Sequence, residues 1–333
     1  MKDWIHKKQT ERLDLLRLVS GKANLPDFMI EKDWWVTAAL EALFTCDLNR
    51  YFVFKGGTSL SKSWNLLSRF SEDIDIVIDK ALFGFGDDQV LGRSQREKMR
   101  DAAHAYIMET VQPMLQARLL AVGIPSKEFK LYAEESKSSD QDPTILFLDY
   151  ASLTQITNDY TKAQIKIEIG VRAMMEPYDT RPISSLLSQH LNINESVGVS
   201  TVLPQRTFWE KLFLLHELFQ KPIEKIDIAR TSRHWYDLHY LINAGFASKA
   251  MEDKALYDAI RNHRKVFTKV PGVDYDTLSP KGFGLFPPKE KESDWNNDYK
   301  KMIESYIYQG APELAVLSAS IGALTDEFNK LHY

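Results

Sequence analysis

The sequence predicts an α/β protein, with a β-sheet core in the first 204 residues and a helical region after them. Before Pro204, short runs typical of strands are interspersed with segments of helical periodicity. After Pro204 the pattern is mostly helical, apart from a loop rich in Pro and Gly at 271–288. A chain of 333 residues is long enough for two packed units. We therefore expect two domains, 1–204 and 205–333.

The helices before this boundary are expected where apolar residues recur every three to four positions. Residues 28–45 show this spacing, with Met29, Trp34, Leu40 and Phe44 among the apolar positions. The same reasoning predicts the remaining helices, at 10–20, 59–68 and 96–121. Pro113 should kink or interrupt the last of them, because proline lacks the N–H that a helix interior requires.

The strands are expected where polar and apolar residues alternate, or where a short apolar run is continuous. Alternation predicts strands at 128–132, 73–78 and 164–169. Continuous apolar runs predict buried strands at 51–54 and 144–150. The first of these two runs ends in a pair of glycines, which indicates a turn directly after the strand.

The composition is that of an ordinary folded protein, with 44% apolar and 26% charged residues. The 42 Lys and Arg against 46 Asp and Glu give a net charge of -4, so nucleic acid would have to bind a local basic patch. Two basic stretches are candidates for RNA contact: Arg93, Arg96, Lys98 and Arg100, and Arg261, His263, Arg264, Lys265 and Lys269. The alternative for each stretch is a solvated surface.

The single cysteine, Cys46, excludes an intrachain disulfide and argues against a cysteine-based zinc site. The first residues resemble no signal peptide, and no apolar run approaches the roughly 20 residues of a membrane span. We therefore expect a cytoplasmic protein without a membrane partner.

The chemistry is predicted from the order of the two segments 55–62 and 69–76. Paired glycines, Gly56 and Gly57, let the backbone approach a ligand closely directly after a strand. Thr58 or Ser59 is suited to cap the following helix, whose first N–H groups attract phosphate. This segment is therefore a candidate nucleotide-binding turn.

Asp73 and Asp75 are two residues apart on a predicted strand, so both carboxylates should point to one face. Two such carboxylates suit Mg²⁺, which prefers oxygen ligands and shares them with substrate phosphates. A Gly-Gly turn or an Asp-x-Asp pair alone is more often structural than catalytic, so the argument depends on their order and spacing. A P-loop is the rival interpretation of 56–63, but Ser61 stands where that motif requires a second glycine.

Glu168 is a candidate third metal ligand or general base, because it shares a predicted strand face with Lys166. Lys166 is in turn a candidate contact to the nucleotide. The alternative for both is an ion pair on the surface of the sheet. In the helical region, Lys211 and Asp237 lie among apolar residues, where charges are usually paired or functional. Lys211 could contact a triphosphate with Asp237 orienting it, or the two could form a buried ion pair between helices.

These motifs resemble the AbiEii/AbiGii-type toxin nucleotidyltransferases, which are related to the MenT toxins. The resemblance spans most of the chain and is most specific at 54–60 with 69–75. The other matching segments are 30–35, 165–168, 210–211, 233–238 and, loosely, 298–302.

The resemblance implies a polymerase-β-like nucleotidyltransferase core with a mixed sheet and a helical C-terminal domain. It also implies Mg²⁺, a nucleoside triphosphate, an RNA acceptor such as a tRNA 3′ end, and a cognate antitoxin protein. By matching position, Gly57, Thr58 and Ser59 would hold phosphates and Asp73 and Asp75 would bind metal. Lys211 and Asp237 would be required for transfer. Two other functions stay open: nucleotide binding without turnover, and phosphotransfer to a protein.

Overall fold

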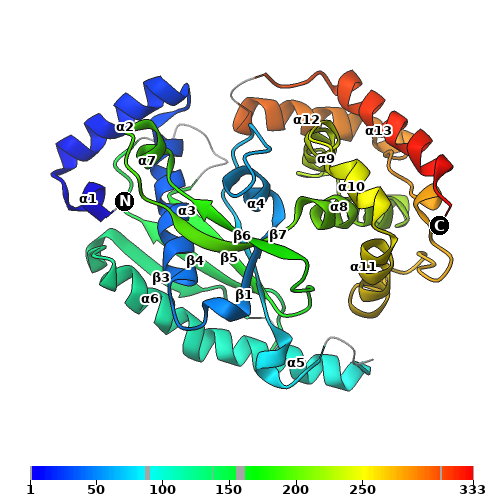
Figure 1. Cartoon of the computed structure of the whole chain (residues 1–333), viewed down its shortest axis with the longest axis horizontal. Helices are drawn as coiled ribbons and strands as arrows, with labels where there is room; N and C mark the ends of the chain where they lie inside the picture. Colours follow the sequence, from blue (N-terminus) through cyan, green and yellow to red (C-terminus); the bar gives the residue numbers. More distant parts are fainter. Residues whose placement is uncertain (1, 87–90, 137, 155–161, 308–309, 333) are drawn as a thin grey trace. The chain divides into compact units, whose positions relative to one another are not determined.

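The computed structural model describes residues 2–86, 91–136, 138–154, 162–307 and 310–332 (Figure 1). The chain divides into two compact units. The first unit contains Met1–Trp64 and Phe70–Val202, and the second contains Asn65–Arg69 and Leu203–Tyr333. The division at Leu203 lies beside the predicted boundary at Pro204. The assignment of the short segment Asn65–Arg69 to the second unit is not predicted from the sequence.

The described residues of the first unit form a seven-stranded mixed sheet with the order β3-β4-β5-β2-β1-β7-β6 (Figure 1). The strand β1 pairs antiparallel with β2 and parallel with β7, and β2 pairs parallel with β5. The strand bounds are β1 Phe52–Lys55, β2 Ile74–Ile78, β3 Phe129–Ala133, β4 Thr144–Tyr150, β5 Gln164–Gly170, β6 Tyr178–Ile183 and β7 Val197–Val202. The five predicted strands are all present, while β6 and β7 were not predicted.

Alternation explains why these segments form a sheet with one buried face. Ile165, Ile167 and Ile169 of β5 are fully buried, and the polar residues between them are partly exposed. The edge strand β6 lacks such a pattern, because Tyr178, Asp179 and the following residues are mostly exposed. The sequence of β6 therefore carries no apolar signal. Val197 and Val199 of β7 do alternate with more exposed residues, so this strand was missed although its pattern is present.

The helices of the first unit are α1 Lys2–His6, α2 Gln9–Ala23, α3 Asp27–Phe44, α4 Gly56–Lys62, α5 Arg93–Tyr106, α6 Gln112–Ala121 and α7 Leu186–His190. The buried helix α3 lies against the sheet, where it contacts β5 and β7 (Figure 1). The helices α2, α6 and α7 pack against α3 in turn. Burial of nearly the whole of α3 makes this helix the centre of the core.

Two predicted helices differ in their bounds. The helix expected at 59–68 is α4, which begins at Gly56 and ends at Lys62; Asn65 then adopts a left-handed φ of 52°. The helix expected at 96–121 is divided into α5 and α6 by a π-helical turn, Ile107–Val111. This turn directly precedes Pro113, so the interruption lies where proline was expected to cause one.

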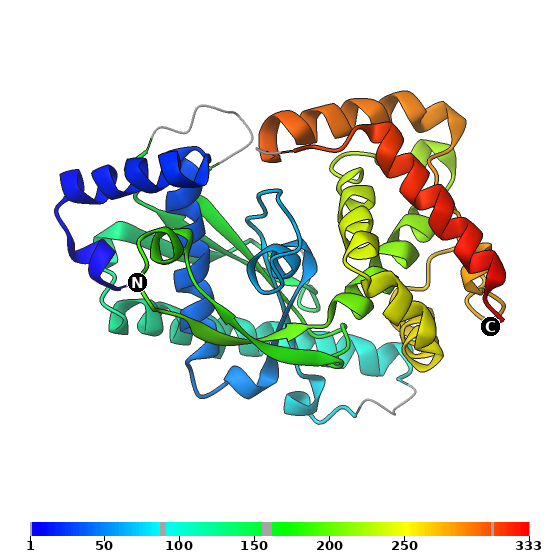
Figure 2. The ribbon, with the colours of Figure 1, turned by 45° about the horizontal axis from the view of Figure 1, so that its top comes forward.

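The second unit is helical, with α8 Pro204–Phe219, α9 Arg233–Asn243, α10 Phe246–Glu252, α11 Lys254–Phe267, α12 Glu292–Tyr306 and α13 Leu314–Lys330. Its core is aromatic: Trp209 of α8 contacts the rings of Tyr257, Phe283 and Phe328. The helix α13 packs along α9 (Figure 2). In the described ranges, each helix of either unit is too short or too polar to cross a membrane.

Candidate active site

The sheet of the first unit brings three charged side chains of neighbouring strands to one face. Asp75 of β2 pairs in register with Lys55 of β1 on one side and with Glu168 of β5 on the other. Residues paired across strands share a face of the sheet. The neighbouring residues Ile74 and Ile76 point the other way and are buried. Asp75 therefore lies between Lys55 and Glu168, on the face of the sheet opposite Ile74 and Ile76.

The glycine turn lies directly against Asp75. Gly56 has a φ of +80°, a conformation that side chains rarely adopt. A Cβ added to Gly56 would lie 2.1 Å from Oδ2 of Asp75 and 2.9 Å from its Cγ. Only a glycine leaves room for the carboxylate here, so the turn and the acidic strand form one site.

Thr58 fixes the main chain that precedes β2. Its hydroxyl donates to the backbone carbonyl of Asp73 and lies 2.7 Å from the hydroxyl of Ser71. The hydroxyl of Ser59 donates to the carbonyl of Gly56 over 2.8 Å. Both side chains are buried, so they hold the turn together. Phosphate contacts at Gly57, Thr58 and Ser59, which stay a prediction, would use their backbone N–H groups.

Lys166 is the positive charge among these acids. Its ammonium group forms an ion pair with Glu168. Burial tends to lower the pKa of Lys166, but the contact with Glu168 raises it more. The charges of Asp73 and Asp75 also raise this pKa, so both carboxylates act on the same ammonium group. The charges of three carboxylates therefore favour the protonated form of one lysine.

The donor set fits a magnesium ion shared with a substrate. Asp73 and Asp75 offer carboxylate oxygens next to the glycine turn, and oxygen ligands of this kind are those that Mg²⁺ favours. Within the described ranges, no group of three or more Asp, Glu, His or Cys side chains could hold a metal by protein ligands alone. Because Glu168 is paired with Lys166, its role as a third ligand stays a prediction.

Three consecutive charged residues of α3 hold segments near this site in place. Lys32, only 1% exposed, forms an ion pair with Glu72, the residue before Asp73. Asp33 accepts from the Leu186 amide over 2.7 Å. The preceding Glu31 accepts hydrogen bonds from the loop residues Ser152, Leu153 and Thr154. The sequence signal for this role is three adjacent charges inside a helix that is mostly apolar.

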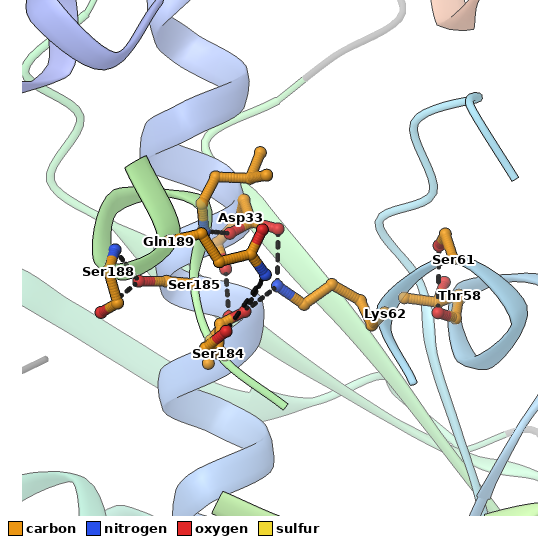
Figure 3. A network of polar contacts seen from close by, with 10 residues as sticks. Asp33, Thr58, Ser61, Lys62, Ser184, Ser185, Ser188 and Gln189 are labelled. Carbon is orange, nitrogen blue, oxygen red and sulfur yellow. Dashed lines mark hydrogen bonds and ion pairs between the residues drawn. The ribbon is translucent and has the colours of Figure 1, made fainter. Parts of the chain in front are cut away.

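Lys62 shows why this turn is not a P-loop. Its ammonium lies 2.7 Å from Oδ1 of Asp33 and donates to the carbonyl of Ser184 over 3.0 Å (Figure 3). Residues 56–62 are helical, so no loop wraps around a phosphate, and the lysine is bound to α3. The P-loop interpretation requires both features, and the structure has neither.

The second unit contains a buried cluster around Asp237, which is fully buried on α9. Lys211 of α8 lies 2.7 Å from Oδ2 of Asp237. Arg69 donates to both carboxylate oxygens, from Nε to Oδ1 over 2.7 Å and from Nη2 to Oδ2 over 2.8 Å. Lys211 and Asp237 therefore form an ion pair, and Arg69, from the motif at 69–75, is its third member.

The charges of this cluster shift one another's ionisation. Burial alone would raise the pKa of Asp237, but Arg69 and Lys211 together hold this pKa below its usual range. Burial lowers the pKa of Lys211, and the charge of Arg69 adds to that effect while Asp237 opposes it. The two cations thus favour the ionised form of Asp237, although its side chain is fully buried.

A family model described as the nucleotidyl transferase AbiEii toxin of a type IV toxin–antitoxin system matches residues 38–323. This range covers most of the chain and includes every predicted site residue from Gly56 to Asp237. The chain belongs to the AbiEii family. It is a nucleotidyltransferase of the kind found in toxin–antitoxin systems. The charged residues 31–33 lie outside the matched range.

One solved structure that matches this AbiEii chain is MenT4, a nucleotidyltransferase toxin of Mycobacterium tuberculosis H37Rv. The two sequences are 14% identical, and the match covers 96% of this chain and 99% of MenT4 with a TM-score of 0.39. No curated protein with which the sequence was compared gives a match.

The basic stretches of this AbiEii chain are largely engaged in internal contacts. In α11, Arg264 donates to Glu217 over 2.7 Å, and Lys265 forms an ion pair with Asp276. In α5, Arg93 pairs with Glu97 and Arg100 pairs with Asp140. These contacts reduce the positive charge that is available to RNA at both stretches, where RNA contact stays a prediction.

Proposed function

We propose that this chain transfers a nucleotide from a nucleoside triphosphate to RNA, with Mg²⁺ as its metal and a tRNA 3′ end as its acceptor. The close approach of Gly56 to Asp75 supports the proposal most directly, because it joins a nucleotide-binding turn to a metal-binding carboxylate. A type IV toxin also implies a cognate antitoxin as partner. Substrates of these kinds would be met in the cytoplasm.

The proposed reaction is an in-line substitution. A hydroxyl oxygen of the RNA forms a bond to the α-phosphorus, the bond to the bridging oxygen breaks, and pyrophosphate leaves. Mg²⁺ held by Asp73 and Asp75 would activate the hydroxyl and offset the charge of the leaving group. Gly56 and Gly57 would let the backbone approach the phosphates.

The lysines would act on the phosphate charge. We assign Lys166 to the nucleotide, with Glu168 holding its ammonium group in place. Glu168 contacts Lys166 through Oε1, so its other oxygen would serve if Glu168 acts as metal ligand or general base. Lys211 would contact the triphosphate and Asp237 would orient it, so both would be required for transfer.

The decisive experiment uses purified protein, Mg²⁺, total RNA and each of the four NTPs, labelled in turn at the α and the γ phosphate. Label from the α position in RNA, with pyrophosphate released, is the expected result. Label from the γ position in protein would instead indicate protein phosphotransfer. Nucleotide binding without any transfer would indicate a protein that has lost catalysis.

The acceptor is tested with purified tRNA, either intact or oxidised by periodate at its 3′ end. Transfer to intact tRNA alone would support the 3′ hydroxyl as the nucleophile. Asp75→Asn should abolish labelling, while Asp179→Asn, which changes an exposed carboxylate of β6, should leave it unchanged. Equal labelling by the two variants would contradict the proposed metal site.

A further inference from the structure

The carboxylate of Asp237 has two cationic partners, both in the second unit. Asp237 is ion-paired with two cations, Lys211 and Arg69, and the side-chain exposures are 0%, 9% and 5% respectively. One cation is enough to neutralise a buried carboxylate that only joins two helices. The second cation therefore points to a role beyond packing.

The geometry of Arg69 fixes the carboxylate rather than only neutralising it. Its guanidinium donates to both oxygens of Asp237, over 2.7 Å and 2.8 Å. Such a two-bond contact sets the orientation of a carboxylate plane, which a single ammonium cannot do. The oxygen Oδ2 then presents one defined position to the Lys211 ammonium, 2.7 Å away.

The backbone around Arg69 is held in the same unit. Arg69 forms an isolated antiparallel bridge with Ile307, next to the end of α12. Leu67, two residues earlier, is largely buried. Arg69 is therefore anchored by its main chain as well as its side chain.

We propose that Arg69 is a positioning residue for nucleotide transfer, acting on Lys211 through Asp237. The inference rests on the proposed function, since it assigns Lys211 to the triphosphate. Arg69 holds the carboxylate in one orientation, and that carboxylate holds the lysine ammonium where a phosphate oxygen would meet it. Arg69 itself does not touch the substrate.

The kinetic test compares the single variants Arg69→Gln, Arg69→Lys and Asp237→Asn. It also includes the double variant that combines Arg69→Gln with Asp237→Asn. A misplaced ammonium group should lower kcat about 10- to 100-fold in Arg69→Gln, with part of the rate restored in Arg69→Lys. The double variant should lose no more than Asp237→Asn alone, because Arg69 acts through that residue. Additive losses would overturn the inference.

A matched control is Arg12→Gln, which removes another buried arginine that pairs with a carboxylate, Glu128 in the first unit. This variant should be destabilised without a fall in kcat. An equal fall in kcat in both variants would mean that the Arg69 effect reflects stability only, and would overturn the inference.

A second readout does not depend on activity. In lysine-labelled protein, the Lys211 ammonium should give an NMR signal protected from exchange, assigned by its absence in Lys211→Arg. Arg69→Gln should lose this protection. If that variant does not fold, Arg69→Lys is measured in its place and should show weaker protection than the wild type. An unchanged signal overturns the inference. Absence of transfer by the wild type to any acceptor would overturn the proposed function while this comparison still tests Arg69.

Discussion

The backbone of Gly56 lies so close to the carboxylate of Asp75 that a side chain at position 56 would overlap it. An ideal Cβ on Gly56 would lie 2.1 Å from Oδ2 of Asp75, far inside any normal contact distance. The register Lys55 to Asp75 between β1 and β2 brings the turn to this place. The proposed metal ligand Asp75 thus lies directly against Gly56, which begins the proposed phosphate-binding turn.

Gly56→Ala should therefore abolish transfer, because the added methyl group displaces Asp75. The left-handed φ should also cost about 1–2 kcal/mol of stability. Gly84→Ala is the matched control, since Gly84 has a φ of +79° with nothing within 4 Å of an added Cβ. It should show the stability cost with unchanged activity. Similar transfer rates in the two variants would contradict the assignment of this contact to the site.

Asp73→Ala should lower transfer at least about 100-fold with little change in thermal stability. Removing one carboxylate relieves repulsion with its neighbour Asp75 in the absence of metal. Thermal unfolding should show that Mg²⁺ with an NTP raises the melting temperature of the wild type more than that of the variant. Unfolding of the variant at ambient temperature would instead show that Asp73 is structural.

Lys62→Met should destabilise the first unit by about 3 kcal/mol, because it leaves the buried Asp33 carboxylate without its cation. Nucleotide affinity measured on the folded fraction should stay near that of the wild type. Arg93→Met, which breaks an exposed ion pair on α5, should leave the denaturation midpoint unchanged. Lost nucleotide binding with full stability would revive the P-loop interpretation.

His234 should make stability fall in mildly acidic solution. Burial, with the nearby charges of Lys211 and Arg233, holds the pKa of His234 well below the ordinary 6.5. The unfolded chain then binds a proton below pH 6.5 that the folded chain does not, so stability falls as pH decreases, by about 1.4 kcal/mol for each unit. Urea unfolding at pH 7.5 and 5.5 should show a smaller loss in His234→Gln than in the wild type. An equal loss of unfolding free energy in the two proteins would contradict the role of His234.

Local pattern predicted most of the secondary structure. The alternation of Ile165, Ile167 and Ile169 predicted β5 because one buried face leaves a period of two in the sequence. Pro113 indicated the interruption between α5 and α6. The edge strand β6 escaped prediction because few of its residues are buried.

The partners of the charged residues were not predictable in the same way. Lys166 and Glu168 were expected on one face, which is correct, but the sequence left their ion pair and a metal-binding role equally open. The motif at 69–75 contains Arg69 but does not indicate its partner, since Asp237 lies 168 residues further along the chain. Such contacts depend on how helices and strands pack, which no local period encodes.

The sequence alone predicted the acidic pair Asp73 and Asp75, the glycine turn before it, and the helical character of the region after residue 204. Of the pair, Asp75 lies within β2 and Asp73 directly precedes it. These features follow from side-chain direction and backbone freedom, which are properties of neighbouring residues. Only the tertiary structure decided that Gly56 meets Asp75, that Glu168 joins Asp75 across β5 and β2, and that Asp237 receives both Arg69 and Lys211. The reason is that strand register and helix packing are set by burial of the whole core, and they bring together groups that the chain itself keeps far apart.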